Sequence, residues 1–314
     1  MSKIREYLFK IVKLTVVYFL PGGKIRDLLM WPVTSRLLGP DYIKVIKLKS
    51  NFSMQAYLGD QLGRMMFFYG DKYEYFWEPT TVRIIEKLAP KARNVLLAGS
   101  HVGLLVLYAR KAMKLSDSVV HTFEPEEDLY KISQHNFDLN SNLGKIVLNK
   151  EGLSNDTANA YIVSDTLRSH VIDHAVAGAK TINLTTIDQY IAKNKIGFLD
   201  FILLDVEGLE YEVFQGATDL LNNNRPRDIV FEVSPRMLGD VKKSDKVFDL
   251  LKEKGYRFYI INDDYSFKKI HKQSQDKEIV SYDTNFLNFK DKDYFNVYAT
   301  QRSEDDIIKI GINL

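Results

Sequence analysis

The chain has 314 residues, of which 45% are hydrophobic and 27% charged, and it contains no cysteine. This length suits one large domain with an extension, or two domains, and the hydrophobic share excludes a wholly disordered protein. Without cysteine there is no disulfide, thiolate metal site, iron–sulfur cluster or cysteine nucleophile. A formal net charge of +2 argues against a nucleic-acid binder recognised by bulk charge, so no nucleic-acid partner is expected.

The charge is unevenly distributed. Residues 1–50 carry ten Lys and Arg against three Asp and Glu, a sum of +7, so residues 51–314 sum to −5. Residues 2–20 are predicted to form an amphipathic helix, closed by Pro21-Gly22-Gly23. Its polar side is basic, and the opposite side is apolar: Ile4, Tyr7, Leu8, Ile11, Leu14 and Tyr18. The apolar part after Lys13 is too short to span a bilayer, and no signal-peptide cleavage site follows it.

Two interpretations of this helix stay open. The first is a peripheral contact of a cytoplasmic protein with the inner face of an anionic membrane. The second is docking on the protein's own core or on a second subunit of a homo-oligomer, since terminal amphipathic helices commonly pack on protein. Residues 40–75 show aromatic-rich alternation, including 45–48 and 65–69, which predicts a short antiparallel excursion. The expected division is an N-terminal α/β extension (1–75), a main domain (76–302) and a C-terminal tail (303–314).

The main domain alternates short apolar runs with amphipathic stretches. Strands are predicted at 94–98, 119–123, 146–149, 198–204 and 228–233, and a late strand pair at 257–261 and 296–300. Helices are predicted up to about 113 and at 126–139, 184–193, 211–221 and 247–254. This order indicates right-handed βαβ units, a mainly parallel sheet with helices on both faces, and ligand binding at the carboxyl ends of the strands.

A glycine turn follows the first of these strands. Gly99 and Gly103 flank it and allow a ligand to approach the backbone and the helix N-terminus. Glu124 ends the next strand, where a carboxylate can accept both ribose hydroxyls of a nucleoside. The third glycine of a dinucleotide fingerprint is missing, which favours S-adenosylmethionine over NAD or a nucleotide sugar.

Several ordered motifs resemble the FkbM-type methyltransferases over residues 73–235. They are LAPKARNVLLAGSHVG (88–103), HTFEPEEDLYKISQHNFDLN (121–140), EGLSND (151–156) and TIDQYIAKNKIGFLDFILLDVEGLEYEVFQGATDLL (186–221). The resemblance implies a class I, Rossmann-like α/β fold whose mainly parallel seven-stranded sheet has an antiparallel last strand. It also implies S-adenosylmethionine as cofactor and O-methylation of a glycan or related small molecule. Residues 97–103 depart from the family's usual D-x-G-A-N-x-G, and the Lys usual before the DVEG segment is absent.

The resemblance and the strand ends together select the site residues. Asp205 ends the most buried strand and is the expected base, with Glu207 as a second catalytic candidate. The alternative is that Asp205 only caps the following turn. The residues expected at the cofactor are Ala98, Gly99, Ser100, His101, Gly103, Glu124, Pro125, Gly152, Leu153 and Asp205. Those expected at the acceptor are Glu207, Glu210 and Glu232.

Metal binding is the disfavoured alternative. Asp205 and Glu232 end neighbouring strands and present the oxygen ligands that Mg²⁺ prefers. His170 and His174 have the i, i+4 spacing of a helical metal pair but lack a third ligand, so a surface role is favoured. His121 is expected in the core. Two further functions stay open: a non-catalytic scaffold that keeps the fold, and a nucleotide-sugar or NAD enzyme.

Overall fold

The computed structural model describes residues 4, 7–12, 14, 32–39, 42–48, 50–59, 61–69, 78–164, 169–172, 174–223, 225–234, 241–262, 277–281 and 295–314. The chain forms two compact units: Met1–Pro79 with Asp264–Gln275, and Thr80–Asp263 with Asp276–Leu314. The predicted helix end at 15–20 and its Pro-Gly-Gly stop lie outside the described residues. Among those described, no helix combines the length and apolar character needed to cross a membrane.

The first unit is built around a hairpin. Residues 7–12 are helical and so are 32–38, and strands β1 (Ile43–Lys47) and β2 (Ser53–Tyr57) pair antiparallel before helix α3 (Gln61–Tyr69). Phe9 packs with Leu38, Leu58 and Phe67 in a small core. The antiparallel excursion is therefore present at 43–57, whereas residues 65–69 belong to a helix. Their apolar residues are consecutive rather than alternating, which leaves helix and strand hard to distinguish from the pattern.

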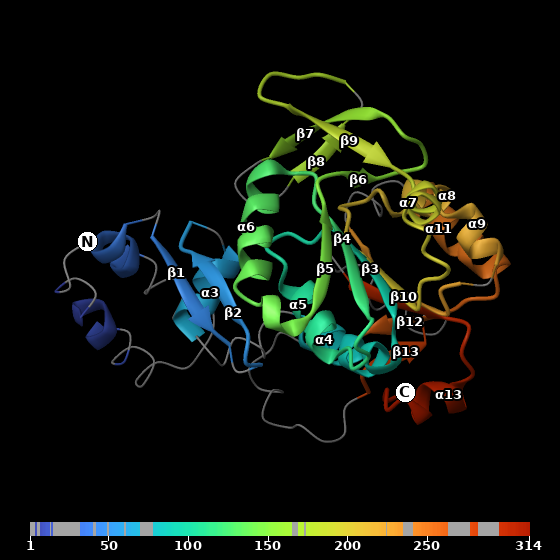
Figure 1. Cartoon of the computed structure of the whole chain (residues 1–314), viewed down its shortest axis with the longest axis horizontal. Helices are drawn as coiled ribbons and strands as arrows, with labels where there is room; N and C mark the ends of the chain where they lie inside the picture. Colours follow the sequence, from blue (N-terminus) through green and yellow to red (C-terminus); the bar gives the residue numbers. More distant parts are fainter. Residues whose placement is uncertain are drawn as a thin grey trace. The chain divides into compact units, whose positions relative to one another are not determined.

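The second unit holds a large mixed sheet (Figure 1). In chain order its first half contains α4 (Pro79–Leu88), η2 (Ala89–Lys91), β3 (Asn94–Ala98), α5 (Leu104–Ala112), β4 (Val119–Phe123), α6 (Glu127–Asp138), η3 (Ser141–Leu143) and β5 (Lys145–Asn149). The later part contains α7 (Ile187–Asn194), β10 (Phe201–Leu204), α8 (Glu210–Gln215), α9 (Thr218–Asn222), β11 (Asp228–Val233), α11 (Val241–Glu253), β12 (Arg257–Ile261), β13 (Ile279–Ser281), β14 (Phe295–Thr300) and α13 (Glu304–Lys309).

The strand order of this sheet is β13-β12-β14-β11-β10-β3-β4-β5. Strands β5, β4, β3, β10 and β11 pair in parallel, and β14 lies antiparallel between β11 and β12. The class I methyltransferase fold predicted from the sequence, with its antiparallel late strand, is confirmed. Among the described residues the sheet has eight strands rather than seven, because β13 adds to the outer edge of β12.

Helices cover both faces of the sheet (Figure 1). Helices α4, α5 and α6 lie on one side of the strands, and α7, α8, α9 and α11 lie on the other. This follows from right-handed crossovers that run in opposite directions from β3 and from β10. The largest core cluster joins Leu204, Phe214, Phe231 and Leu251, so β10 and β11 are sealed by α8 and α11. This packing holds the ends of β3, β4 and β10 in fixed relative positions.

A second sheet stands between β5 and β10 in the chain. It has the order β6 (Gly152–Leu153), β9 (Lys180–Thr185), β7 (Asn159–Ser164) and β8 (Ser169–Ile172). In Figure 1 it lies beyond the ends of the parallel strands. The sequence interpretation missed this sheet and put 184–185 in a helix. His170 lies on strand β8 and not on a helix, which rules out the helical spacing of a metal pair, and His174 is exposed, in agreement with the favoured surface role.

Candidate functional site

The strand order reverses between β3 and β10, and the loops that follow these strands meet. The backbone N–H of Asp205 donates to the carbonyl of Ala98 at 3.0 Å. Gly99 has φ +78°, and a Cβ there would lie 1.6 Å from the carbonyl oxygen of Asp205. Only glycine fits such a contact. In open α/β sheets this reversal point is where ligands bind.

Hydrogen bonds to β4 and to α6 hold the loop 99–103 on both sides. The N–H groups of Gly99 and Ser100 both donate to the carbonyl of Phe123 at 3.2 Å. From α6, the Asn136 amide donates to the carbonyl of Val102 at 2.8 Å, and the Ser133 hydroxyl donates to that of His101. The sequence interpretation knew Asn136 only as part of a family motif and missed Ser133. Their three-residue spacing on one helix was the available signal.

His101 has a left-handed backbone, with φ +49°. Asn, Asp and His adopt this region far more readily than other residues with a Cβ. His therefore preserves the backbone geometry at the position where the family motif usually has Asn. Its N–H donates to Glu124 Oε2 at 2.8 Å.

Glu124 is almost wholly buried at the end of β4. Its two carboxylate oxygens accept the N–H groups of His101 at 2.8 Å and Glu126 at 3.1 Å. Burial raises the pKa of Glu124 to about 8, and the charges of Glu126 and Asp205 add to the rise, although the two N–H groups oppose it. In the ionised form each oxygen keeps a second lone pair with which to accept a ribose hydroxyl.

The loop after β10 has an unusual backbone held by a buried acid. Glu207 and Gly208 are both left-handed, with φ +54° and +95°. Glu210 is fully buried, and its Oε1 accepts the N–H groups of Val206 at 3.3 Å and Gly208 at 3.4 Å. Burial raises the pKa of Glu210 to about 8, and the charge of Asp205 contributes. Its Oε2 is buried without a hydrogen-bond partner.

Three carboxylates thus converge at the switch point. Asp205 is partly exposed and acts electrostatically on Glu124 and Glu210, whose hydrogen bonds come only from backbone N–H groups. A positive ligand would relieve their mutual repulsion. The buried Ser100 hydroxyl also lacks a hydrogen-bond partner. These residues fit a nucleoside cofactor that carries a sulfonium charge.

The remaining predicted residues lie around this edge. Pro125 lines a cavity of about 210 Å³ together with Lys150, Ile162 and Lys180. Gly152 and Leu153 are buried in β6. Leu204 pairs with Phe231 on the neighbouring strand. The next residues along the two strands, Asp205 and Glu232, therefore lie side by side. The described part of the chain holds no group of three or more metal-ligating side chains, and a two-carboxylate metal site stays a prediction.

The His121 prediction is confirmed. His121 is buried, and its ring nitrogens lie 2.9 Å from Tyr190 Oη and 3.3 Å from Asn94 Oδ1. Burial lowers its pKa to about 4, and Lys145 contributes.

The family model described as the methyltransferase FkbM domain matches residues 98–258, which is 161 of the 314 residues. The chain belongs to the FkbM methyltransferase family. It is an enzyme whose cofactor is S-adenosylmethionine, as the sequence predicts. The family assignment therefore supports a methyltransferase over the nucleotide-sugar or NAD alternative. No curated protein matches the sequence.

Solved methyltransferase structures are distantly similar. An O-methyltransferase from Bacillus cereus in complex with SAH is 15% identical, with a TM-score of 0.41, covering 71% of this chain and 79% of that one. The O-methyltransferase TomG from Streptomyces achromogenes, in complex with SAM, is 13% identical with a TM-score of 0.39 and the same coverage. A SAM-dependent methyltransferase from Agrobacterium tumefaciens is 9% identical with a TM-score of 0.43, covering 83% and 70%. The family match, and not these likenesses, decides the assignment.

Proposed function

We propose that this methyltransferase modifies a hydroxyl of a glycan or a related small metabolite, with Asp205 as the general base. The observation that carries the proposal is the difference in burial among the three converging carboxylates. Glu124 and Glu210 are closed off from solvent and tied to backbone N–H groups, whereas Asp205 is partly exposed. Asp205 is therefore the carboxylate of the three that an acceptor can reach.

When bound, the cofactor supplies an electrophilic methyl group on a sulfonium. Asp205 would accept the proton that the acceptor hydroxyl loses as its oxygen bonds to the methyl carbon and the carbon–sulfur bond breaks. Such assistance contributes about 10²–10⁴-fold in rate, and the rest comes from in-line positioning. Glu207, partly exposed two residues later, is proposed to hold the acceptor by a hydrogen bond, and Glu232 keeps its predicted acceptor role.

Glu210 receives a different role from the one predicted from the sequence. Its carboxylate is fully buried and holds the N–H groups of Val206 and Gly208. We therefore assign it to positioning the loop that carries Asp205 and Glu207, in place of contact with the acceptor.

The test uses labelled cofactor and fractionated cell extract, followed by identification of the labelled product. We expect Asp205→Asn to keep cofactor affinity within a few-fold, measured by calorimetry, and to lose about 10²–10⁴-fold in turnover. Asp249→Asn, on the exposed side of α11, is the matched control and keeps full activity. Full turnover of Asp205→Asn would refute the base assignment, and a label on nitrogen or carbon would refute the acceptor class.

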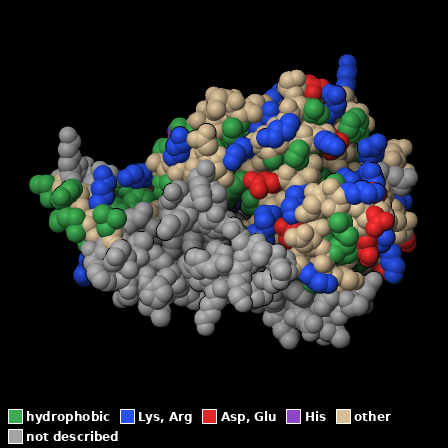
Figure 2. Space-filling model, turned by 90° about the horizontal axis from the view of Figure 1, so that it is seen from below, with side chains coloured by type: hydrophobic (Ala, Val, Ile, Leu, Met, Phe, Trp, Pro, Cys, Tyr) green, Lys and Arg blue, Asp and Glu red, His purple; other side chains and the backbone are tan. Residues whose placement is uncertain are grey.

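A peripheral membrane contact is also part of the proposal. Of eleven exposed large hydrophobic side chains among the described residues, eight lie before residue 46: Ile4, Tyr7, Leu8, Ile11, Leu14, Val33, Ile43 and Val45. Phe9 is buried and packs on Phe67, which anchors the helix of residues 7–12 to the first unit. The exposed apolar side chains around it, Tyr7, Leu8 and Ile11 among them, form what we call the apolar stripe. In Figure 2 green and blue side chains gather on this part of the chain. Apolar exposure beside a +7 segment suits an anionic bilayer surface.

Flotation with vesicles tests this contact. We expect binding to vesicles with anionic lipid, weaker binding to neutral ones, and loss of binding in Leu8→Asp/Leu14→Asp. Glu253→Gln, on α11, serves as control. A homo-oligomer would use the same stripe, so dimerisation in solution without vesicle binding, measured by light scattering, would replace the membrane by a second copy.

A further inference from the structure

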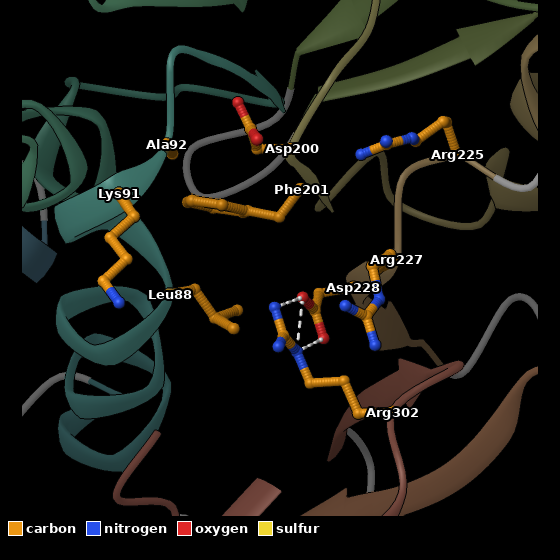
Figure 3. A pocket seen from close by; sticks show the side chains of 9 residues that line it. All are labelled: Leu88, Lys91, Ala92, Asp200, Phe201, Arg225, Arg227, Asp228 and Arg302. Atoms are coloured by element: carbon orange, nitrogen blue, oxygen red, sulfur yellow. Dashed lines mark hydrogen bonds and ion pairs between the residues drawn. The ribbon is translucent and has the colours of Figure 1, made fainter. Parts of the chain in front are cut away.

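A second cavity lies at the opposite end of the sheet from the three carboxylates. Its volume is about 210 Å³, several times the roughly 30 Å³ that a water molecule occupies in the liquid. Its walls come from the end of α4 and η2, from the start of β10 and β11 and the residues before them, and from Arg302, two residues after β14 (Figure 3). The nine lining residues are Leu88, Lys91, Ala92, Asp200, Phe201, Arg225, Arg227, Asp228 and Arg302.

The two acids of this cavity are already satisfied. Asp228 is buried, and its carboxylate accepts Arg302 at 2.7 Å together with the hydroxyls of Tyr298 at 2.6 Å and Thr300 at 2.8 Å. Asp200 accepts the backbone N–H groups of residues 93 and 94 at 2.7 and 3.0 Å. Asp228 is thus paired with Arg302, whereas Asp200 is bound to backbone N–H groups and forms no ion pair among the described residues.

Three cations remain without an ion pair. The ion pairs of the described residues include none with Lys91, Arg225 or Arg227. Arg225 lies over the ring of Phe198, 5.3 Å from its centroid, which orients the guanidinium without neutralising it. Arg227 acts electrostatically on the exposed Asp306, beyond ion-pair distance. Lys91, Arg225 and Arg227 are all exposed, so water screens their mutual repulsion and leaves them free to bind an anion.

We propose that this cavity binds a phosphate group. The guanidinium forks of Arg225 and Arg227 lie on the same side of the cavity and suit the several oxygens of a phosphate, while Lys91 adds positive charge from the opposite side (Figure 3). The buried Phe201 and Ala92 form an apolar wall, which reduces screening by water and strengthens the attraction. The volume leaves room beside the phosphate for part of an organic group, so inorganic phosphate and a phosphorylated metabolite share this chemistry.

The site is separate from the cofactor. Phe201 begins β10 and Asp205 follows its end, so the strand places the two roughly 13 Å apart at about 3.3 Å per residue. A phosphate ligand therefore does not compete with the cofactor, and the inference does not depend on the acceptor or on the base.

The test is a titration of the full chain at low ionic strength, by calorimetry and ³¹P NMR, with inorganic phosphate and with ribose 5-phosphate. Potassium chloride at matched ionic strength is the blank. We expect saturable binding that weakens at least tenfold in Arg225→Glu/Arg227→Glu and is unchanged in Lys193→Glu/Lys252→Glu, a control of equal charge change at exposed positions. Cofactor affinity is expected to be equal in all three proteins, which also shows that the variants are folded.

Comparing the two ligands shows whether the site takes free phosphate or a phosphorylated metabolite. Binding of inorganic phosphate alone indicates a free anion, and clearly tighter binding of ribose 5-phosphate indicates a phosphorylated metabolite. No saturable binding of either ligand to the unmodified protein overturns the proposal. Equal binding by the Arg225→Glu/Arg227→Glu variant overturns it as well.

Discussion

Replacing Glu124 by Gln should change how the stability of the protein depends on pH. The pKa of Glu124 rises from its ordinary value of 4.5 to about 8 in the folded protein, mainly through burial. Between these values the folded state binds more protons than the unfolded state. The contribution of this group to the free energy of unfolding is therefore full below pH 4.5 and is lost as the pH rises to 8.

The magnitude follows from the shift. One pKa unit corresponds to about 1.4 kcal/mol, so between pH 5.5 and 8 this group alone lowers the free energy of unfolding by about 3 kcal/mol. Gln does not ionise and lacks this dependence. A Gln amide satisfies only one of the two N–H groups of His101 and Glu126, which costs about 1–3 kcal/mol. That cost is present at every pH and cancels when the two pH values are compared.

Urea denaturation at pH 5.5, 7 and 8.5 measures the effect. We expect the stability of Glu124→Gln relative to the unmodified protein to rise by about 3 kcal/mol from the lowest to the highest pH. The exposed Glu253→Gln on α11 should run parallel to the unmodified protein. Glu210 shows the same kind of shift but is present in every variant, so it also cancels. Parallel curves for Glu124→Gln would refute the reasoning, since Glu124 would then ionise freely in the fold.

Three further predictions follow from the site and the sheet. Cofactor affinity should rise up to about tenfold per pH unit towards pH 8 and then level, since Glu124 accepts the ribose hydroxyls best when it has lost its proton; an affinity that does not change over this range would contradict this. Gly99→Ala should weaken cofactor binding at least tenfold in calorimetry, because the new Cβ would collide with the loop after β10. Gly255→Ala is the control: its backbone has nearly the same positive φ, but its Cβ would meet open space, so cofactor binding should not change. Asp228→Asn should lower the free energy of unfolding by about 3 kcal/mol in urea. Asp117→Asn, in an exposed ion pair, should lower it by less than about 1 kcal/mol, and equal losses would contradict the role of burial.

The parallel strands could be predicted from the sequence because burial on both faces makes them continuous apolar runs. The bounds of β3, β4, β11 and β12 are as predicted, and each run ends at turn or polar residues. The second sheet was missed because its strands are short and mix polar with apolar residues, as in β9 (KTINLT). The helix predicted at 211–221 is two helices, because Asp188 of α7 accepts the N–H groups that begin α9. That contact joins residues about thirty positions apart and leaves no local pattern.

In the site too, local sequence predicts some features and long-range packing determines the others. The sequence places Gly99, Glu124 and Asp205 at strand ends, and the topology then requires them to lie near one another. Burial could not be predicted in this way. Glu210 follows a DVEG segment like any exposed acid, and only the packing of α8 closes it from solvent and aims it at its own loop. An acid's position in a motif therefore does not distinguish contact with an acceptor from support of the backbone.

The placement of β14 between β11 and β12 has a consequence for how the protein folds. Strands β3, β4 and β5 pair with one another within residues 94–149, and only the other edge of β3 waits for the distant β10. In contrast, β12 pairs with β13 and β14, and β14 pairs with β11 across 62 residues at Val233 ↔ Phe295 and 72 residues at Asp228 ↔ Thr300. Closing such long loops is slow. Pulse-labelling hydrogen exchange should therefore show the β3–β5 half protected first, with β12 gaining protection only together with β14.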